Sequence, residues 1–265
     1  MLKTEMRNPR TTHIDKMSTA EMVNIMTDEN FRAVEAVKAA AAQIGEAVDA
    51  VTASFENNGR LFLIGAGTSG RLGVLDAAEC PPTFGVSSDM VTGIIAGGAK
   101  CMFAASEGEE DNEQKGRADI IAHNISKHDC VVGISAAGNA AYVVGALSAA
   151  REIGATTIAL CCNRGCKIEA ESDICICTDT GPEVITGSTR LKAGTAHKMV
   201  LNIITTCSMT KIGNVYENMM INLKPSNQKL RQRMINIVCE ICGCDAGEAE
   251  QRLEEHGWKI REAVS

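Results

Sequence analysis

Residues 61–71 read Leu-Phe-Leu-Ile-Gly-Ala-Gly-Thr-Ser-Gly-Arg, and they are the most informative part of the chain for its fold class. Its four apolar residues predict a strand buried on both faces, and the glycine-rich turn after them predicts the start of a helix. Further apolar strands are expected at 90–95, 130–134, 156–161 and 174–178, separated by helical stretches. This alternation implies a parallel sheet with helices on both sides. The sequence therefore predicts an α/β protein, a three-layer α-β-α sandwich around a central parallel sheet.

Helical sequence flanks this α/β region on both sides. From Ser18 to about Phe55, Ala, Val and Ile recur at three- and four-residue intervals. A long helix is expected from Ser188 to Lys211, and the last residues are expected to form short helices separated at Gly243 and Gly257. We therefore expect three parts: an N-terminal helical segment (1–55), the α/β domain (56–227) and a small C-terminal helical tail (228–265).

The composition argues against several classes of partner. The chain has 265 residues, of which 45% are hydrophobic, and a net charge of −7 without a long basic run. Nucleic acid and anionic membranes are therefore not expected as partners. The most apolar stretch, Cys130 to Cys162, is interrupted by Asn139 and by Arg151-Glu152, so no membrane span is expected.

The twelve cysteines do not suggest a metal site or a disulfide framework. Most are embedded in apolar runs, where cysteine behaves as a small hydrophobic residue. The clusters Cys239/Cys242/Cys244 and Cys161/Cys162/Cys166 lack a second pair or nearby histidines with zinc-like spacing. The first ten residues lack the apolar core of a secretion signal. We expect reduced thiols in the cytoplasm, and neither metal nor other cofactor.

The turn at 65–71 is the first candidate binding site. Amides at a helix N-terminus attract an anion, glycine permits close approach, and Thr68 and Ser69 add hydroxyl groups. A dinucleotide loop fits poorly, because Arg71 stands where a small residue is wanted, and no Gly-Lys-Ser/Thr is present for a nucleotide loop of the Walker type. A small phosphate ester is favoured. The simpler alternative is a strand-to-helix turn whose Ser or Thr caps the helix.

A second stretch, Thr186-Gly187-Ser188-Thr189-Arg190-Leu191-Lys192, has a similar character. Two hydroxyls stand where a helix is expected to start, and two cations follow within one turn. These features indicate a second anion site, with an ordinary Ser N-cap as the alternative.

Two acidic features complete the set of candidates. Glu79 is expected at the end of its helix, where a carboxylate faces the negative end of the helix dipole. The cluster Glu107-Gly108-Glu109-Glu110-Asp111 is, by composition, more typical of a solvated helix start. Spacing alone does not show that Glu79 and Glu110 meet. The five histidines are scattered without a ligand spacing, and structural or surface roles are expected for them.

Together these motifs resemble those of N-acetylmuramic acid 6-phosphate etherases, in matching order from about Arg7 to the C-terminal tail. The motifs that carry the resemblance are Gly65–Arg71, Leu75–Thr83, Ile95–Gly98, Glu107–Asp111 and Thr186–Lys198. Any one of them alone would indicate only the wider sugar isomerase (SIS) fold.

The resemblance implies a bacterial cytoplasmic lyase that forms a homodimer and uses no metal or other cofactor. It implies that Glu79 is the proton donor and that Glu110 is the second catalytic carboxyl group. The sugar-phosphate contacts that it implies are Thr68, Ser69, Gly70, Ser135, Gly138, Ser188 and Thr189, with Glu107, Glu183 and Lys192 as weaker candidates.

One departure from the family pattern leaves alternatives open. After Ser135, etherases often read Ala-Ser-Gly-Arg-Thr-Pro, whereas this chain reads Ala136-Ala137-Gly138-Asn139-Ala140-Ala141. Losing a charge-assisted contact costs about 1.5–3 kcal/mol of binding free energy. A non-catalytic sugar-phosphate sensor and an aldose-ketose isomerase on the same fold are the competing hypotheses.

Overall fold

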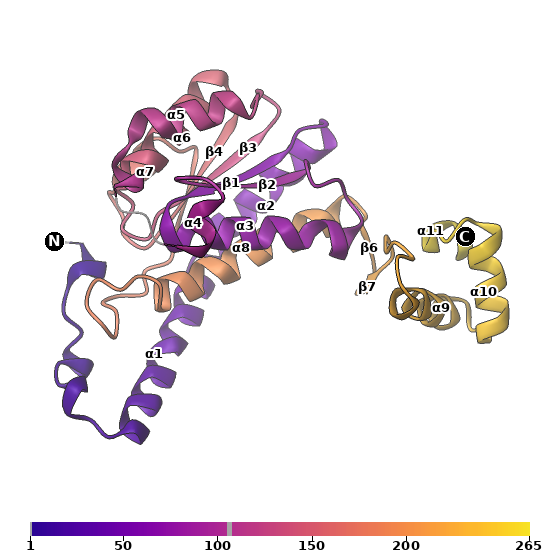
Figure 1. The fold of residues 1–265 in the computed structure, drawn as a ribbon, viewed down its shortest axis with the longest axis horizontal. Helices are drawn as coiled ribbons and strands as arrows, with labels where there is room; N and C mark the ends of the chain where they lie inside the picture. The colour runs from indigo at the N-terminus through magenta and orange to yellow at the C-terminus, as the bar shows by residue number, and fades with distance from the viewer. Residues whose placement is uncertain (1, 105–107) are drawn as a thin grey trace.

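The predicted strands form one parallel sheet in the computed structural model, which describes residues 2–104 and 108–265 (Figure 1). Its strand order is β2-β1-β3-β4-β5, and every neighbouring pair is parallel. The strands are β1 (Leu61–Gly65), β2 (Val91–Ile95), β3 (Cys130–Ile134), β4 (Thr156–Cys161) and β5 (Ile174–Cys177). The order turns back beside β1, so the carboxyl ends of β1 and β3 flank the point where a doubly wound sheet binds its ligand.

Helices cover both faces of this sheet. The helices of the α/β region are α3 (Gly67–Phe84), α4 (Lys100–Phe103), α5 (Glu113–Ala122), α6 (Ala141–Ile153), α7 (Lys167–Ala170) and α8 (Lys192–Lys211), with a short turn of 3-10 helix, η4 (Glu109–Asp111). Leu61 and Leu63 of β1 pack in one hydrophobic cluster with α3 and α8, whereas Phe62 and Ile64 pack in a second cluster with α5 and α6. Because successive strand residues point to opposite faces, one fully apolar strand serves both clusters. The predicted three-layer α-β-α sandwich is confirmed.

The N-terminal helical stretch is divided into two helices. Three short 3-10 turns precede them, η1 (Lys3–Glu5), η2 (Pro9–Thr11) and η3 (Ile14–Lys16), and the helices are α1 (Thr19–Ala39) and α2 (Ala41–Glu56). Ser18 caps α1 in a capping box with Glu21, as expected for a helix that starts at that point. The outer end of α1 extends beyond the sheet (Figure 1).

Two predicted helix limits were wrong. The helix that carries Glu79 does not end there but continues to Phe84, through Pro81 and Pro82. Cys80 and Phe84 are buried in the core, which holds this last turn in place although the prolines lack amide donors. The second helix, α8, begins at Lys192 and not at Ser188, because the carboxylate of Glu183 accepts the N–H groups of Lys192 and Ala193 and so fixes the helix start.

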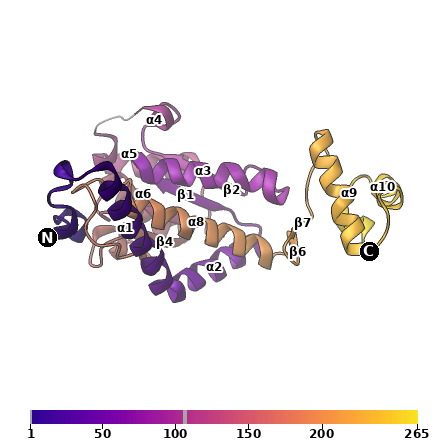
Figure 2. The ribbon, with the colours of Figure 1, turned by 90° about the horizontal axis from the view of Figure 1, so that it is seen from below.

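The C-terminal residues form a separate small cluster of helices. A hairpin of β6 (Val215–Tyr216) and β7 (Met219–Met220) leads to α9 (Gln228–Cys242), α10 (Ala246–Glu255) and α11 (Ile260–Ala263). These helices share a hydrophobic cluster of their own and lie beyond the end of α3 and α8 in both views (Figures 1 and 2). The limits of the three proposed parts stay predictions. In the two described segments of the chain, no helix is both long enough and apolar enough to span a membrane.

Candidate active site

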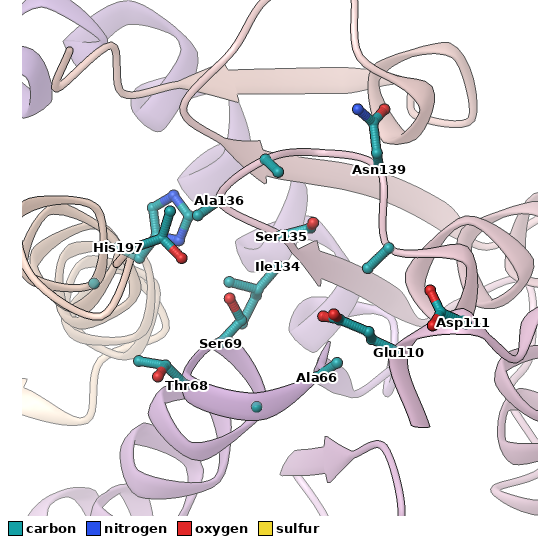
Figure 3. A pocket seen from close by; sticks show the side chains of 15 residues that line it. Ala66, Thr68, Ser69, Glu110, Asp111, Ile134, Ser135, Ala136, Asn139 and His197 are labelled. Carbon is teal, nitrogen blue, oxygen red and sulfur yellow. The ribbon is translucent and has the colours of Figure 1, made fainter. Parts of the chain in front are cut away.

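A cavity of about 340 Å³ lies at the carboxyl ends of β1 and β3. Four stretches that are far apart in the sequence form its walls: the β1–α3 turn, the loop after β3, η4, and the end of the loop before α8 together with the first turns of α8. Its lining residues include four hydroxyl-bearing side chains, two carboxyl groups and a histidine, namely Thr68, Ser69, Ser135, Thr189, Glu110, Asp111 and His197 (Figure 3). The strand order predicts a ligand site at the carboxyl ends of β1 and β3, and the polar side chains gather at the same place.

The first wall is the N-terminus of α3. The helix begins at Gly67, and its N-cap residue is Ala66, whose side chain makes no capping hydrogen bond. Thr68 and Ser69 thus lie inside the first turn, and their hydroxyls are not used as caps, so the simpler alternative for this stretch is wrong. Gly70 belongs to the same turn and is buried. A Cβ there would lie 2.5 Å from the carbonyl oxygen of Gly65, so this position requires glycine. The first amides of a helix have no partner within the helix and attract an anion.

The second wall is the loop after β3. The hydroxyl oxygen of Ser135 accepts the N–H of Gly138 at 3.1 Å, and Gly138 has a φ of 80°. Gly138 supports the wall from behind and does not line the cavity, whereas Asn139 does. The carbonyl of Ala136 accepts the backbone N–H of Cys162 at 3.0 Å, which ties this wall to the end of β4. This chain has Asn139 where etherases often have an arginine, so backbone groups and the Ser135 hydroxyl form this wall without a guanidinium.

Glu110 forms the third wall from η4. Its side chain points across the cavity towards Ser69 and Ser135 (Figure 3). The neighbouring Glu109 is paired instead with Lys115, with 2.6 Å between Oε2 and Nζ. Glu107, the other candidate in this cluster, lies outside the described residues. The acidic cluster thus supplies an exposed carboxylate to the cavity, although its composition is typical of a solvated helix start.

Only some candidates in and just before α8 line the cavity, and others fix the position of the helix. Thr189 lines the cavity, but Ser188 does not. Glu183 is fully buried at the start of α8, and burial raises the pKa of its carboxyl group. The buried ammonium of Lys192 points away to Glu29 of α1. Neither Glu183 nor Lys192 lines the cavity, and both hold the helix that does.

Glu79 is on the exposed surface of α3, away from Glu110. It lines a different cavity, of about 240 Å³, together with Asp76, Lys198 and Asn202. Ten residues of one helix separate it from Ser69, and at 1.5 Å per residue this corresponds to roughly 15 Å. Because α3 continues past Glu79, the predicted conflict with the helix dipole does not arise. Within one chain, the two glutamates therefore line separate cavities.

Comparison with known proteins identifies the family. Residues 43–151 match the glucokinase regulatory protein N-terminal SIS domain, and residues 101–206 match the SIS domain. The chain is 50% identical over 263 residues to the N-acetylmuramic acid 6-phosphate etherase of Francisella tularensis subsp. novicida, which covers 99% of this chain and 90% of that protein. The protein of the same name from Oceanobacillus iheyensis is 49% identical over 263 residues, again 99% of this chain and 90% of that protein. This chain belongs to the N-acetylmuramic acid 6-phosphate etherase family.

Solved structures relate this etherase-family chain to other SIS proteins by fold alone. A phosphoheptose isomerase from Neisseria gonorrhoeae aligns with a TM-score of 0.56 and 22% identity, over 73% of this chain and 100% of that one. A phosphosugar isomerase from Bacteroides fragilis, described as putative, aligns with a TM-score of 0.54 and 18% identity, over 74% and 94%.

Sequence reasoning missed three polar residues of the etherase-family cavity, Asp111, Asn139 and His197. The imidazole is buried, and its Nε2 lies 3.4 Å from the Sγ of Cys162. Burial lowers the pKa of His197 to about 4, so the ring is neutral at pH 7 and able to donate one hydrogen bond. Its position within the Thr186–Lys198 motif was the available signal. Across residues 2–104 and 108–265, no three His, Cys, Asp or Glu side chains are grouped so as to hold a metal ion.

Proposed function

We propose that this chain is a carbon–oxygen lyase that cleaves the lactyl ether of N-acetylmuramic acid 6-phosphate, giving N-acetylglucosamine 6-phosphate and D-lactate. The observation that carries the proposal is the 340 Å³ cavity, in which a helix N-terminus and four hydroxyls face the carboxylate of Glu110. Relatives at about half identity over the whole chain bear the name of this etherase.

The phosphate is the anchoring group. Thr68 and Ser69 in the first turn of α3, with Ser135 and Thr189 opposite, offer hydroxyl donors around the helix amides. We infer that the phosphate binds there, with the buried ring of His197 behind it on the α8 side of the cavity. Binding energy from the unreactive phosphate positions the distant carbons for reaction.

The chemistry calls for two carboxyl groups. In the open-chain aldehyde, the hydrogen beside the carbonyl is acidic, and lactate is attached at the next carbon. One carboxylate removes that hydrogen while a protonated carboxyl group supports departure of the lactate oxygen, and water then adds to the unsaturated aldehyde. General acid–base assistance of this kind contributes about 10²–10⁴-fold to the rate. Glu110 takes one of these roles, and Glu79 takes that of the proton donor.

A second copy of the chain would bring Glu79 to the site. The outer face of α1 exposes four large apolar side chains at helical spacing, Val23, Met26, Phe31 and Val34, of which Phe31 is 63% exposed. Leu75, one turn before Glu79 on α3, is 49% exposed. Apolar surface of this kind supports burial against another protein chain. We infer a homodimer in which Glu79 of one copy faces Glu110 of the other.

The location of the protein is part of the same proposal. All twelve cysteines are unpaired. Free thiols persist in a reducing compartment, which supports the cytoplasm.

One assay tests the proposed activity directly. The purified chain is incubated with N-acetylmuramic acid 6-phosphate, and D-lactate and N-acetylglucosamine 6-phosphate are measured. We expect equal amounts of both products. An isomeric sugar phosphate without lactate would favour an isomerase, and a thermal shift without any product would favour a sensor; either result would reject the proposal.

A further inference from the structure

Four cysteines gather behind the second wall of the cavity. Cys161 ends β4, Cys175 and Cys177 belong to β5, and Cys166 stands in the loop before α7. All four pack in the same hydrophobic cluster, on the α6 face of the sheet. The Sγ atoms of Cys161 and Cys175 are 3.9 Å apart. These side chains do not form a metal-binding group, so we ask whether their thiols can react with one another.

Cys161 and Cys177 have the relationship that a disulfide requires. They are direct partners in the register of β4 and β5, so their side chains leave the same face of the sheet. Neighbouring strands lie about 4.8 Å apart, within the 4.4–6.8 Å between Cα atoms that a disulfide spans.

Cys177 is also open to small molecules. It is half-buried and lines a cavity of about 240 Å³ together with Lys3, Asn163 and Arg164. The neighbouring Cys161 thiol lowers the pKa of Cys177, and the positive charge of Arg164 lowers it further. The pKa of Cys161 is raised, chiefly by its hydrogen bonding with Cys166, so Cys161 keeps its proton. One thiol is therefore accessible and activated, and the other is buried beside it.

We propose that Cys177 and Cys161 form an oxidation site for small hydroperoxides. The Cys177 sulfur attacks the peroxide, the O–O bond breaks, and a sulfenic acid and an alcohol (or water) result. The Cys161 sulfur then attacks the Cys177 sulfur, its proton leaves with the hydroxyl as water, and the S–S bond forms. Two thiols give two electrons to one peroxide, and an added dithiol reverses the step.

Oxidation of these cysteines would change the active-site cavity by moving the loop that contains Gly138. A Cβ on Gly138 would lie 2.3 Å from the Sγ of Cys166 and 3.6 Å from the Cβ of Cys161, so these cysteines support the loop directly. The side-chain amide of Asn163 donates to the carbonyl of Ala136 at 3.2 Å. A bond that draws Cys161 towards Cys177 therefore shifts the support of the Ser135 wall. With the proposed etherase activity, the expected result is weaker substrate binding.

The test uses hydrogen peroxide on the full chain, followed by catalase, intact mass and peptide mapping. We expect a loss of about 2 Da, a Cys161–Cys177 cross-linked peptide, and return of both thiols with dithiothreitol. Cys177→Ser and, separately, Cys161→Ala should prevent this cross-link. Cys207→Ser, which removes the exposed thiol of α8, should leave it intact.

Mass and mapping do not depend on activity, so they separate this proposal from the etherase proposal. Where lactate is released, the oxidised chain should show a KM raised by roughly fivefold or more, restored by dithiothreitol and absent in Cys177→Ser. Unchanged mass after peroxide, or a disulfide between other cysteines, would overturn the proposal.

Discussion

The ammonium of Lys192 lies 2.5 Å from the carboxylate of Glu29, and the two side chains are 2% and 4% exposed. Asn8 and Arg10 donate to the same carboxylate. This group of contacts ties the N-terminal segment and α1 to the start of α8, which places His197, and Thr189 just before the helix, at the cavity. Lys192, a sequence candidate for substrate binding, instead holds the scaffold of the site.

Removing Lys192 should therefore damage stability first. Lys192→Met leaves Glu29 buried without its strongest partner, and breaking such a pair from one side costs about 3–5 kcal/mol. Urea unfolding measures the loss. Lys211→Met, which breaks the exposed pair between Lys211 and Asp49, should cost less than about 1 kcal/mol. The double variant Lys192→Met/Glu29→Leu should lose less than Lys192→Met alone; equal losses would contradict a buried pair.

His197 should make stability depend on pH. Its folded pKa, about 4, is below the unfolded value of 6.5, so the unfolded chain binds the proton more readily between these values. Stability is then fully present above pH 6.5 and falls as the pH drops towards 4, by up to about 1.4 kcal/mol per pH unit. Denaturation at pH 7 and pH 5 should show a smaller difference for His197→Gln. His256→Gln, at an exposed histidine, should keep the wild-type difference.

Ser135→Ala tests the phosphate end of the cavity. The change removes a donor to the substrate and leaves the N–H of Gly138 without its acceptor. Losing a hydrogen bond to a charged group costs about 1.5–3 kcal/mol, so KM should rise at least tenfold while kcat changes little. Ser172→Ala, whose hydroxyl donates to Glu169 remote from the cavity, is the matched control. A fall in kcat at constant KM would assign Ser135 to the chemical step instead.

Glu110→Gln tests the carboxyl group of the cavity. The substitution keeps the shape but removes the proton-transferring group, so kcat should fall about 10²–10⁴-fold. The comparison is Glu109→Gln, one residue away, whose side chain is paired with Lys115 outside the cavity. It should retain most of the activity. Similar losses in both variants would point to disruption of η4 and not to catalysis.

Mixing two inactive variants tests whether a partner supplies Glu79. If each site combines Glu110 of one copy with Glu79 of the other, a mixed dimer of Glu79→Gln and Glu110→Gln has one intact site. After exchange of subunits, equal mixing should recover about a quarter of wild-type activity, because half the dimers are mixed and each has one working site. Activity that stays at the level of the separate variants would show that the site does not form across a dimer.

Local patterns predicted much of the fold. The apolar runs at 130–134 and 156–161 match β3 and β4 residue for residue, because a strand buried on both faces must be apolar throughout. Helix limits were predicted less accurately, because they depend on contacts with other parts of the chain. The buried carboxylate of Glu183 moved the start of α8, and the buried side chains of Cys80 and Phe84 held α3 together beyond Glu79.

Local periodicity and short motifs were enough to predict the parallel sheet, the turn that presents Thr68 and Ser69, and the family. Which candidates share a cavity became clear from the folded chain. It brought Glu110, Ser135 and His197 together, turned Lys192 towards Glu29, and left Glu79 some distance along α3. The physical reason is that hydrophobic periodicity assigns a residue to a strand or a helix face, whereas the meeting of distant polar groups depends on packing between elements.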